Sequence, residues 1–267
     1  MHSGGRSVVT IGAYDGVHIG HRLVIERVRS LAASEGLRGV VLTFDRHPAS
    51  IVRPDSAPLL LTDLAQKLEL LAATGIDDIE VIQFDEERAT ETAEEFVTSV
   101  LVSQLRVAAV VVGRNFHFGK ARGGNVALLE EMGAELGYRV APFDLVMDDE
   151  AGAGPPEVVS STRIRRHIAA AELAAAERLL GRPHEVRGVA ADGAGNAVTV
   201  EVPPEILLPP PGRYSGRLGS LQRREQWQVC EARLEDGSPH GGIVTVTGEN
   251  LVARSGEAVR LVFDRPG

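Results

Sequence analysis

The 267-residue chain contains one cysteine, Cys230, and one tryptophan, and its aromatic residues amount to 4%. A single cysteine excludes a disulfide within the chain, which is typical of a reducing compartment. No apolar run approaches the roughly 20 residues that a membrane-spanning helix needs. The first residues, Met1 to Arg6, lack the apolar stretch of a secretory signal. We therefore expect a cytoplasmic protein without a membrane partner.

The chain also has no excess of basic residues. Its 37 acidic residues outnumber the 28 lysines and arginines and give a net charge of -9. Nonspecific binding to nucleic acid needs cations that neutralise phosphates, so nucleic acid is not an expected partner. A single nucleotide needs only a local basic cluster. The length and the 43% of hydrophobic residues suffice for one large or two medium cores.

Over the first two thirds of the chain, short apolar runs alternate with segments of helical periodicity. The apolar runs are typical of buried strands, and they comprise residues 8–11, 39–44, 79–84, 107–112 and 138–143. Helices are expected after residue 21, over residues 64–71, from a capping box at 92–95, and over 126–136. This alternation predicts an α/β fold, with a Rossmann-like doubly wound parallel sheet covered on both faces.

The composition changes near Arg182 and Pro183. Beyond this point proline, glycine and short β-branched runs dominate, which predicts a small all-β domain, an antiparallel barrel or sandwich. We therefore expect two domains, residues 1–183 and 184–267. The Gly/Ala/Pro-rich stretch 148–156 is expected to be a loop.

Two histidines, His18 and His21, stand between the first predicted strand and the first predicted helix, in a turn with Gly12, Gly16 and Gly20. The N-terminus of a helix offers unpaired N–H groups and the positive end of a dipole, which suit a polyphosphate. Histidines three residues apart share one face, and glycine lets the backbone approach an anion closely. A surface turn or a metal pair is the alternative, but no third metal ligand stands nearby.

Polar segments follow three further strands, in the region where ligands of parallel sheets bind. They comprise residues 43–48, 113–120 and 159–166. Each has a simpler interpretation, because Asp45 and His47 could cap a turn, residues 114–120 could form a solvated basic loop, and Ser160 could be an ordinary N-cap. The arginines at 163–166 oppose the dipole of the helix that they open, however, unless an anion binds there. Together with the histidine turn, these segments predict an anion-binding site.

The histidine turn resembles the His-x-Gly-His signature of the nucleotidyltransferase superfamily. With Thr-Phe-Asp-Arg-His-Pro at 43–48, Val-Val-Gly-Arg-Asn-Phe-His-Phe-Gly at 111–119 and Ser-Ser-Thr-Arg-Ile-Arg at 160–165, the chain resembles the adenylyltransferase module of prokaryotic bifunctional riboflavin kinase/FAD synthetase. The resemblance runs from Val8 to Pro183, where that family passes to its kinase module. It implies a sheet of the nucleotidyltransferase type and transfer of AMP from ATP to FMN, with Mg²⁺, giving FAD and pyrophosphate.

The resemblance also implies roles for individual residues. The expected catalytic residues, which stabilise charge on the phosphates, are His18, His21 and Arg163. The expected ATP-binding residues are Gly12, Tyr14, Asp15, Gly16, Gly20, Gly113, Ser160, Ser161 and Thr162. The expected flavin- or acceptor-binding residues are Asp45, His47, Asn115, Phe116 and Phe118.

The chain departs from the family's pattern on the acceptor side. Ala13 and Tyr14 stand where the family usually has Asn-Phe, Arg46 where it has Pro, and His117 where it has Arg. A nucleotidyltransferase with a different phosphorylated acceptor is therefore an alternative, and a flavin- or nucleotide-binding regulator without turnover is another.

The second domain lacks the Gly-rich stretch ending in Pro-Thr-Ala-Asn that the family's kinase module carries. Residues 189–199 read Val-Ala-Ala-Asp-Gly-Ala-Gly-Asn-Ala-Val-Thr instead. Donors to a transferred phosphate must be placed to within about half an ångström, so a missing phosphate loop is hard to replace. We expect a riboflavin-kinase-like barrel without kinase activity.

Overall fold

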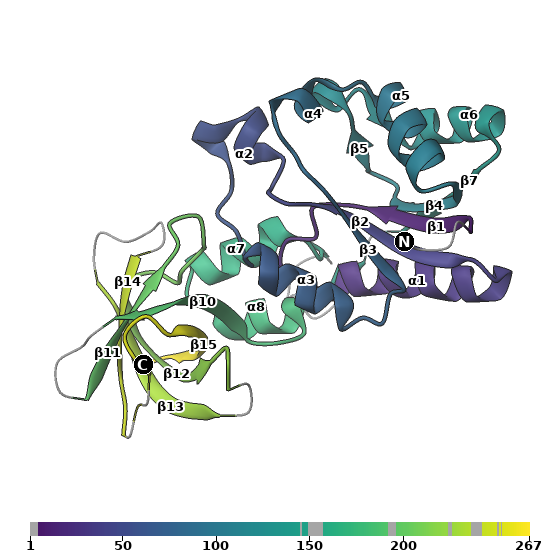
Figure 1. Cartoon of the computed structure of the whole chain (residues 1–267). Helices are drawn as coiled ribbons and strands as arrows, with labels where there is room; N and C mark the ends of the chain where they lie inside the picture. The colour runs from purple at the N-terminus through teal and green to yellow at the C-terminus, as the bar shows by residue number, and fades with distance from the viewer. Residues whose placement is uncertain are drawn as a thin grey trace. The chain divides into compact units, whose positions relative to one another are not determined.

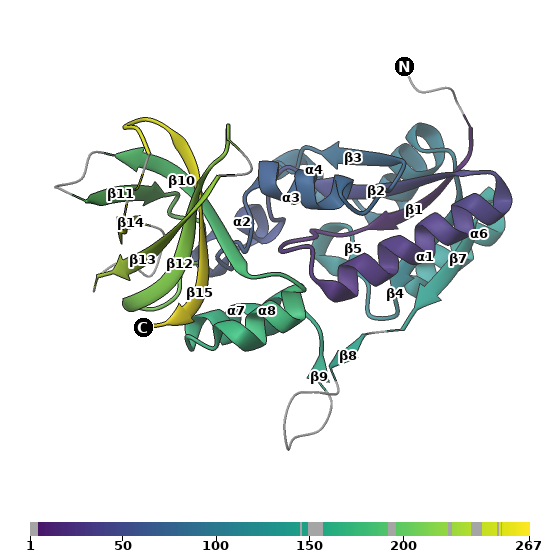
Figure 2. The same ribbon diagram turned by 90° about the horizontal axis from the view of Figure 1, so that it is seen from below.

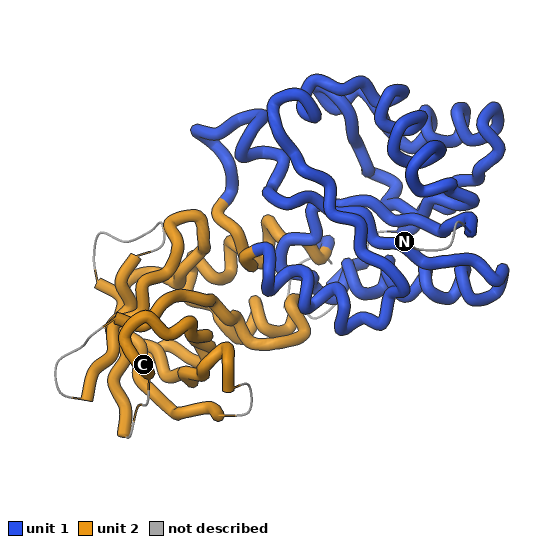
Figure 3. Tube along the Cα trace, viewed as in Figure 1, with its two compact units in different colours: residues 1–58, 64–158 blue, residues 59–63, 159–267 orange. Residues whose placement is uncertain are grey.

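The computed structural model describes residues 5–144, 146–148, 157–191, 196–223, 226–235, 242–249, 251 and 253–267. Internal contacts divide the chain into two compact units (Figure 3). The first comprises Met1–Pro58 and Leu64–Val158, and the second comprises Leu59–Asp63 and Val159–Gly267.

The first unit is built on a five-stranded sheet in the order β3-β2-β1-β4-β7 (Figure 1). All neighbouring strands are parallel, which confirms the predicted doubly wound fold. The strands are β1 (Ser7–Ile11), β2 (Arg38–Phe44), β3 (Asp78–Ile82), β4 (Val107–Gly113) and β7 (Arg139–Phe143). β3 ends two residues before the predicted end, because the N–H of Phe84 donates to the carboxylate of Asp45 instead of a strand carbonyl.

Helices cover both faces of this sheet. One face packs against α1 (Ile19–Glu35) and α3 (Leu64–Ala72), and Figure 2 looks onto α1 on this side. The other face packs against α5 (Ala93–Phe96), η2 (Val97–Gln104) and α6 (Val126–Leu136). The predicted capping box is present at the start of α5, between Thr92 and Glu95.

Shorter elements fill the connections of the first unit. They are α2 (Ala49–Val52), η1 (Pro54–Ser56), α4 (Glu86–Thr90), β5 (His117–Phe118), η3 (Lys120–Arg122), β6 (Gly124–Asn125), β8 (Met147–Asp148) and β9 (Glu157–Val158). The predicted loop at 148–156 lies mostly outside the described residues.

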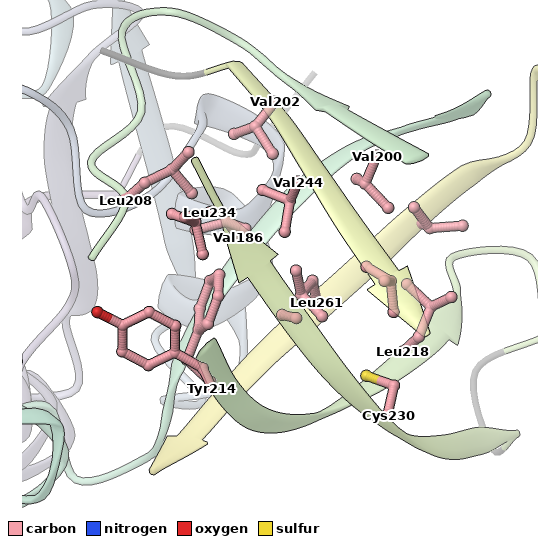
Figure 4. Close-up of a cluster of buried hydrophobic side chains, with 14 of the residues drawn as sticks. Val186, Val200, Val202, Leu208, Tyr214, Leu218, Cys230, Leu234, Val244 and Leu261 are labelled. Atoms are coloured by element: carbon pink, nitrogen blue, oxygen red, sulfur yellow. The ribbon is translucent and has the colours of Figure 1, made fainter. Parts of the chain in front are cut away.

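The second unit contains a closed barrel in the order β10-β11-β14-β13-β12-β15, with antiparallel pairing throughout. Its strands are β10 (His184–Ala191), β11 (Ala197–Val202), β12 (Gly212–Ser220), β13 (Trp227–Leu234), β14 (Gly242–Thr247) and β15 (Ala258–Pro266). Figure 4 shows apolar side chains of these strands, Val200, Val244 and Leu261 among them, gathered in the barrel interior. The predicted all-β domain is therefore a barrel with a packed core.

Two helices, α7 (Ser161–Ala169) and α8 (Leu173–Leu180), belong to the same unit as the barrel. Leu173 packs into the barrel core, and Arg165 Nε donates to the carbonyl of Leu59 at 2.6 Å. Leu60 in turn pairs with Ile206. The sequence placed the domain boundary after Pro183, where β10 begins, whereas these contacts group residues from Val159 onward with the barrel.

No helix in the described part of the chain is both long and apolar enough to span a membrane. Residues 192–195, within the stretch that stands in place of the family's kinase motif, lie outside the described residues.

Candidate functional site

The histidine turn leaves β1 at Ile11 and enters α1 at Ile19 through a strained backbone. Tyr14 (φ 51°), Gly16 (φ 81°) and Val17 (φ 38°) all have left-handed conformations, which only glycine adopts without cost. Tyr14 is held by burial and by a 2.7 Å hydrogen bond between its hydroxyl and that of Thr10. Burial also raises the pKa of Tyr14 well above its usual range. Strain of this kind persists where the surroundings impose it, often at a ligand site.

His18 is the N-cap of α1, and its ring orients His21. Nδ1 of His18 accepts a hydrogen bond from the N–H of His21 at 3.2 Å. Since Nδ1 is the acceptor, the proton of the neutral ring stands on Nε2. The two imidazoles stack with their centroids 3.5 Å apart. A donor of fixed direction thus lies at the N-terminus of a helix, as phosphate binding requires.

His21 is neutral at pH 7. Its pKa lies well below the usual value, first because of burial and second because His18 is adjacent. Its Nδ1 is buried and has no hydrogen-bond partner within the described residues. Its ring makes an edge-type contact with Tyr14 at a centroid distance of 4.9 Å. The paired rings are therefore positioned mainly as hydrogen-bonding groups, not as two permanent cations.

Of the remaining predicted ATP-binding residues of the first unit, three belong to this turn and Gly113 ends the neighbouring strand β4. Gly12 follows β1, and a Cβ there would lie 3.1 Å from the ring of Tyr14. Asp15 is buried in the turn, and Gly20 is buried in the first turn of α1. Gly113 ends β4, where its carbonyl accepts from the N–H of Phe116 at 2.9 Å.

A buried lysine that the sequence analysis missed ties the turn to the sheet. Lys67 Nζ donates to the carbonyl of Ala13 at 3.3 Å and to that of Phe44 at 2.7 Å. Burial lowers the pKa of Lys67, while the carboxylates of Asp15 and Asp45 oppose this shift. The sequence held one indication that Lys67 is buried, because residue 67 lies on the apolar stripe of α3 with residues 64, 68 and 71.

An aromatic cavity of about 310 Å³ lies beside the histidine turn and includes Gly12 and Ala13 in its wall. This volume is within the range of small-molecule sites. Five of the chain's seven phenylalanines line it, and they are Phe44, Phe84, Phe96, Phe116 and Phe118. Phe116 and Phe118 stack with their centroids 5.4 Å apart. The walls therefore suit a planar aromatic ring.

The five predicted acceptor-binding residues divide into two groups. His47, Phe116 and Phe118 line the cavity, whereas Asp45 and Asn115 are not in its wall. Asp45 Oδ1 accepts the N–H of Phe84 at 2.8 Å, and this bond joins the ends of β2 and β3. Burial raises the pKa of Asp45, but hydrogen bonds from Phe84 and Arg46 outweigh it, so the pKa is lowered. Asn115 is exposed, and its carbonyl lies 2.8 Å from His117 Nδ1.

The predicted Ser160–Arg163 segment lies in the second unit and opens α7. Ser160 is the N-cap, and its hydroxyl accepts from the N–H of Arg163 at 3.3 Å. Ser161 is half-buried, Thr162 is exposed and Arg163 is buried. The structure thus gathers the histidine turn and the aromatic cavity in one unit, and it places the second predicted phosphate-binding segment in the other.

No group of three or more His, Cys, Asp or Glu side chains that could hold a metal ion occurs in the part of the chain that the structure describes.

Curated relatives match this chain over most of its length. The bifunctional riboflavin kinase/FMN adenylyltransferase of Escherichia coli (strain K12) is 36% identical over 196 residues, which are 73% of this chain and 61% of that protein. The protein of the same name from Pseudomonas fluorescens is 36% identical over 68% of this chain and 56% of its own length. This chain therefore spans about three fifths of the length of the curated relatives that it matches.

A solved structure described as a macrolide-efflux protein from Streptococcus pneumoniae has a TM-score of 0.82, with 22% identity over 100% of this chain and 86% of that one. This similarity shows the fold alone. The FAD synthetase family matches residues 2–163, which is more than half of the sequence. The chain belongs to the FAD synthetase family.

Proposed function

We propose that this protein transfers AMP from ATP to FMN and releases pyrophosphate, giving FAD. The observation that carries the proposal is the phenylalanine-lined cavity that shares Gly12 and Ala13 with the histidine turn. A planar flavin ring in this cavity would bring its phosphate tail to the turn that suits the phosphates of ATP.

In the proposed reaction, a phosphate oxygen of FMN attacks the α-phosphorus of ATP, and the bond from that phosphorus to the pyrophosphate oxygen breaks. Such a transfer depends on in-line positioning and on stabilising the charge that spreads over the phosphate oxygens. His18 and His21 would supply hydrogen bonds to these oxygens at the N-terminus of α1. Gly12, Gly16 and Gly20 would let the backbone approach them.

Ser161, Thr162 and Arg163 are proposed to bind the pyrophosphate end of ATP. Support comes from the N-terminus of α7, where Ser160 already caps the helix. Mg²⁺ is proposed to bind together with the phosphates of ATP, because this ion is usually held by substrate phosphates and only one or two carboxylates.

We further propose that the barrel has no riboflavin kinase activity. The support is the sequence at 189–199, which lacks the family's phosphate-binding stretch. Incubation with riboflavin and ATP should therefore give no FMN, and FMN formation would refute this part of the proposal.

The test of the main activity uses the full chain with Mg²⁺, ATP and FMN. We expect FAD and pyrophosphate in equal amounts, separated by chromatography. Parallel reactions with other phosphorylated acceptors test the alternative substrate, and a folded protein that binds ATP but releases no pyrophosphate with any acceptor would support the regulator instead. Failure to form FAD would overturn the assignment of FMN.

A further inference from the structure

The aromatic cavity carries an unbalanced positive charge. The fully charged residues in its wall are Arg88, Glu91 and Arg122. Arg88 Nη1 lies 2.6 Å from Glu91 Oε2, so these two charges compensate each other. Across the described residues, the guanidinium of Arg122 has neither an ion pair nor a hydrogen bond. Its position in the cavity wall distinguishes Arg122 from other exposed arginines of the chain.

A strained hairpin loop carries Arg122. β5 and β6 pair in antiparallel fashion, with Phe118 opposite Gly124, and the loop connects them. Ala121 (φ 53°) and Arg122 (φ 60°) are both left-handed, a conformation that costs L-residues about 1 kcal/mol or more each. Successive strained residues in the wall of a cavity point to a functional constraint.

The loop is anchored firmly enough to hold this strain. The N–H of Lys120 donates to the carbonyl of Glu91 at 2.8 Å. A Cβ at Gly119 would lie 2.7 Å from the backbone nitrogen of Ala93, and one at Gly124 would lie 2.6 Å from its Cβ. The loop therefore packs as closely as possible against the start of α5, and Arg122 is presented from a fixed backbone.

We propose that Arg122 binds the phosphate of FMN and thereby selects phosphorylated flavin over riboflavin. The inference rests on the proposed function. Arg122 is exposed and lines the same cavity as Gly12 and Ala13 of the histidine turn. The phosphate of a flavin whose ring occupies the apolar part of the cavity would lie between the turn and this guanidinium. A guanidinium matches two phosphate oxygens with parallel hydrogen bonds.

The aromatic walls cannot make this selection, because FMN and riboflavin share the same ring. Discrimination between them requires a group that interacts with the phosphate and stays unpaired without it. Arg122 meets this requirement, whereas Arg88 already pairs with Glu91.

The experiment compares the parent protein with Arg122→Gln, Arg122→Lys and the matched control Lys120→Gln, an exposed cation of the same loop outside the cavity wall. Each protein is titrated with FMN, riboflavin and ATP separately, with flavin fluorescence following the first two. Arg122→Gln should weaken FMN binding by roughly tenfold or more and leave riboflavin and ATP unchanged. Arg122→Lys should retain part of the affinity, and Lys120→Gln all of it.

Equal weakening of FMN and riboflavin would place Arg122 against the ring and overturn the proposal, as would a loss confined to ATP. FAD formation by the parent separates the two levels of inference. If the parent makes FAD and Arg122→Gln binds FMN normally, only the role of Arg122 fails. If the parent neither binds FMN nor makes FAD, the proposed function fails first.

Discussion

At the scale of single residues, the histidine pair combines a helix cap with a ring-stacking contact. His18 cannot leave its position without uncapping α1, and His21 stacks on it with Nδ1 unpartnered within the described residues. An unpaired buried nitrogen is costly. This cost favours a role for His21 in ligand binding over a role in stability.

We predict that His21→Ala slows FAD formation by about 10²- to 10³-fold, the usual loss for one group that stabilises developing negative charge. Stability should change little, because the lost packing is offset by removing an unsatisfied polar atom. Steady-state kinetics with ATP and FMN measure the first effect, and thermal unfolding measures the second. Turnover equal to that of the parent would remove His21 from the mechanism.

Lys67 gives a second residue-scale prediction. Lys67→Met keeps the length of the side chain but removes the donor to the carbonyls of Ala13 and Phe44. The carbonyl of Phe44 loses its side-chain donor, while that of Ala13 keeps the hydroxyl of Thr43. Loss of such a donor costs about 1–3 kcal/mol, so the free energy of unfolding of the first unit should fall by that amount and FAD formation should slow.

Denaturant unfolding followed by circular dichroism measures the loss for Lys67→Met. The exposed Lys120→Met provides the control, which should match the parent in both stability and turnover. Full stability and activity in Lys67→Met would show that Thr43, whose hydroxyl lies 3.3 Å from the same Ala13 carbonyl, holds the turn alone.

The sequence pointed to the histidine turn and to Phe116 and Phe118. It did not point to Lys67 or Arg122, or to the other phenylalanines of the cavity wall. The turn can be recognised in the sequence because its glycines and histidines occur close together in the chain. The groups around Lys67 and Arg122 come from segments tens of residues away in the chain. A local sequence pattern therefore cannot reveal them. The carboxylate of Asp45 accepts the N–H of Phe84, a contact that the sequence did not show, and its role toward an acceptor stays a prediction.

At the scale of elements, apolar runs were sufficient to find every strand of the parallel sheet, because buried strands of this type are continuously hydrophobic. The helix from residue 93 was expected from its capping box and apolar face, but the change to π-helical hydrogen bonding over Val97–Gln104 was not. The N–H of Leu105 bonds to the carbonyl of Val100, five residues earlier, and this rare spacing has no periodic signal in the sequence.

Variants at the start of α7 distinguish a role in stability from a role in ligand binding. Ser160→Ala should lower the free energy of unfolding of the second unit by about 1 kcal/mol, because one backbone N–H loses its acceptor. Thr162→Ala should leave stability unchanged, since Thr162 is exposed, yet weaken inhibition by pyrophosphate if the proposed role of this segment is right.

Fluorescence of Trp227, the chain's single tryptophan, reports the unfolding of the second unit. Thr92→Ala, which removes the equivalent cap from α5 in the first unit, is the matched control and should not alter pyrophosphate inhibition. Equal pyrophosphate inhibition in all three variants and the parent would exclude the α7 segment from the site.

At the scale of the whole molecule, composition separated a parallel α/β region from a barrel, but it did not reveal that a short early segment belongs to the unit of the barrel. Leu59–Asp63 belongs to the unit of the barrel because Leu60 exchanges backbone hydrogen bonds with Glu205 and Leu207, about 145 residues later. Such long-range pairing leaves no periodic signal in either partner. The domain limits at 183 and 184 stay a prediction based on composition.

A buried histidine at the entry to the barrel predicts the response of the second unit to acid. His184 begins β10, is 2% exposed, and its Nε2 lies 3.0 Å from the carbonyl of Leu207. A carbonyl only accepts, so the neutral ring donates from Nε2. Burial is the main reason that the pKa of His184 is lowered from 6.5 to about 4.

The lowered pKa fixes the sign of the effect. Below pH 6.5 the unfolded chain takes up a proton at His184, whereas the folded barrel does not until about pH 4. The free energy of unfolding therefore falls as the pH decreases through this window, by about 2 kcal/mol at pH 5 relative to pH 7. His184→Gln retains a neutral donor and cannot titrate, so it should lose about 2 kcal/mol less than the parent over the same interval. Urea unfolding at pH 7 and pH 5, followed by Trp227 fluorescence, measures the difference, and an equal loss in both proteins would mean that His184 takes up its proton in the folded state as readily as in the unfolded one.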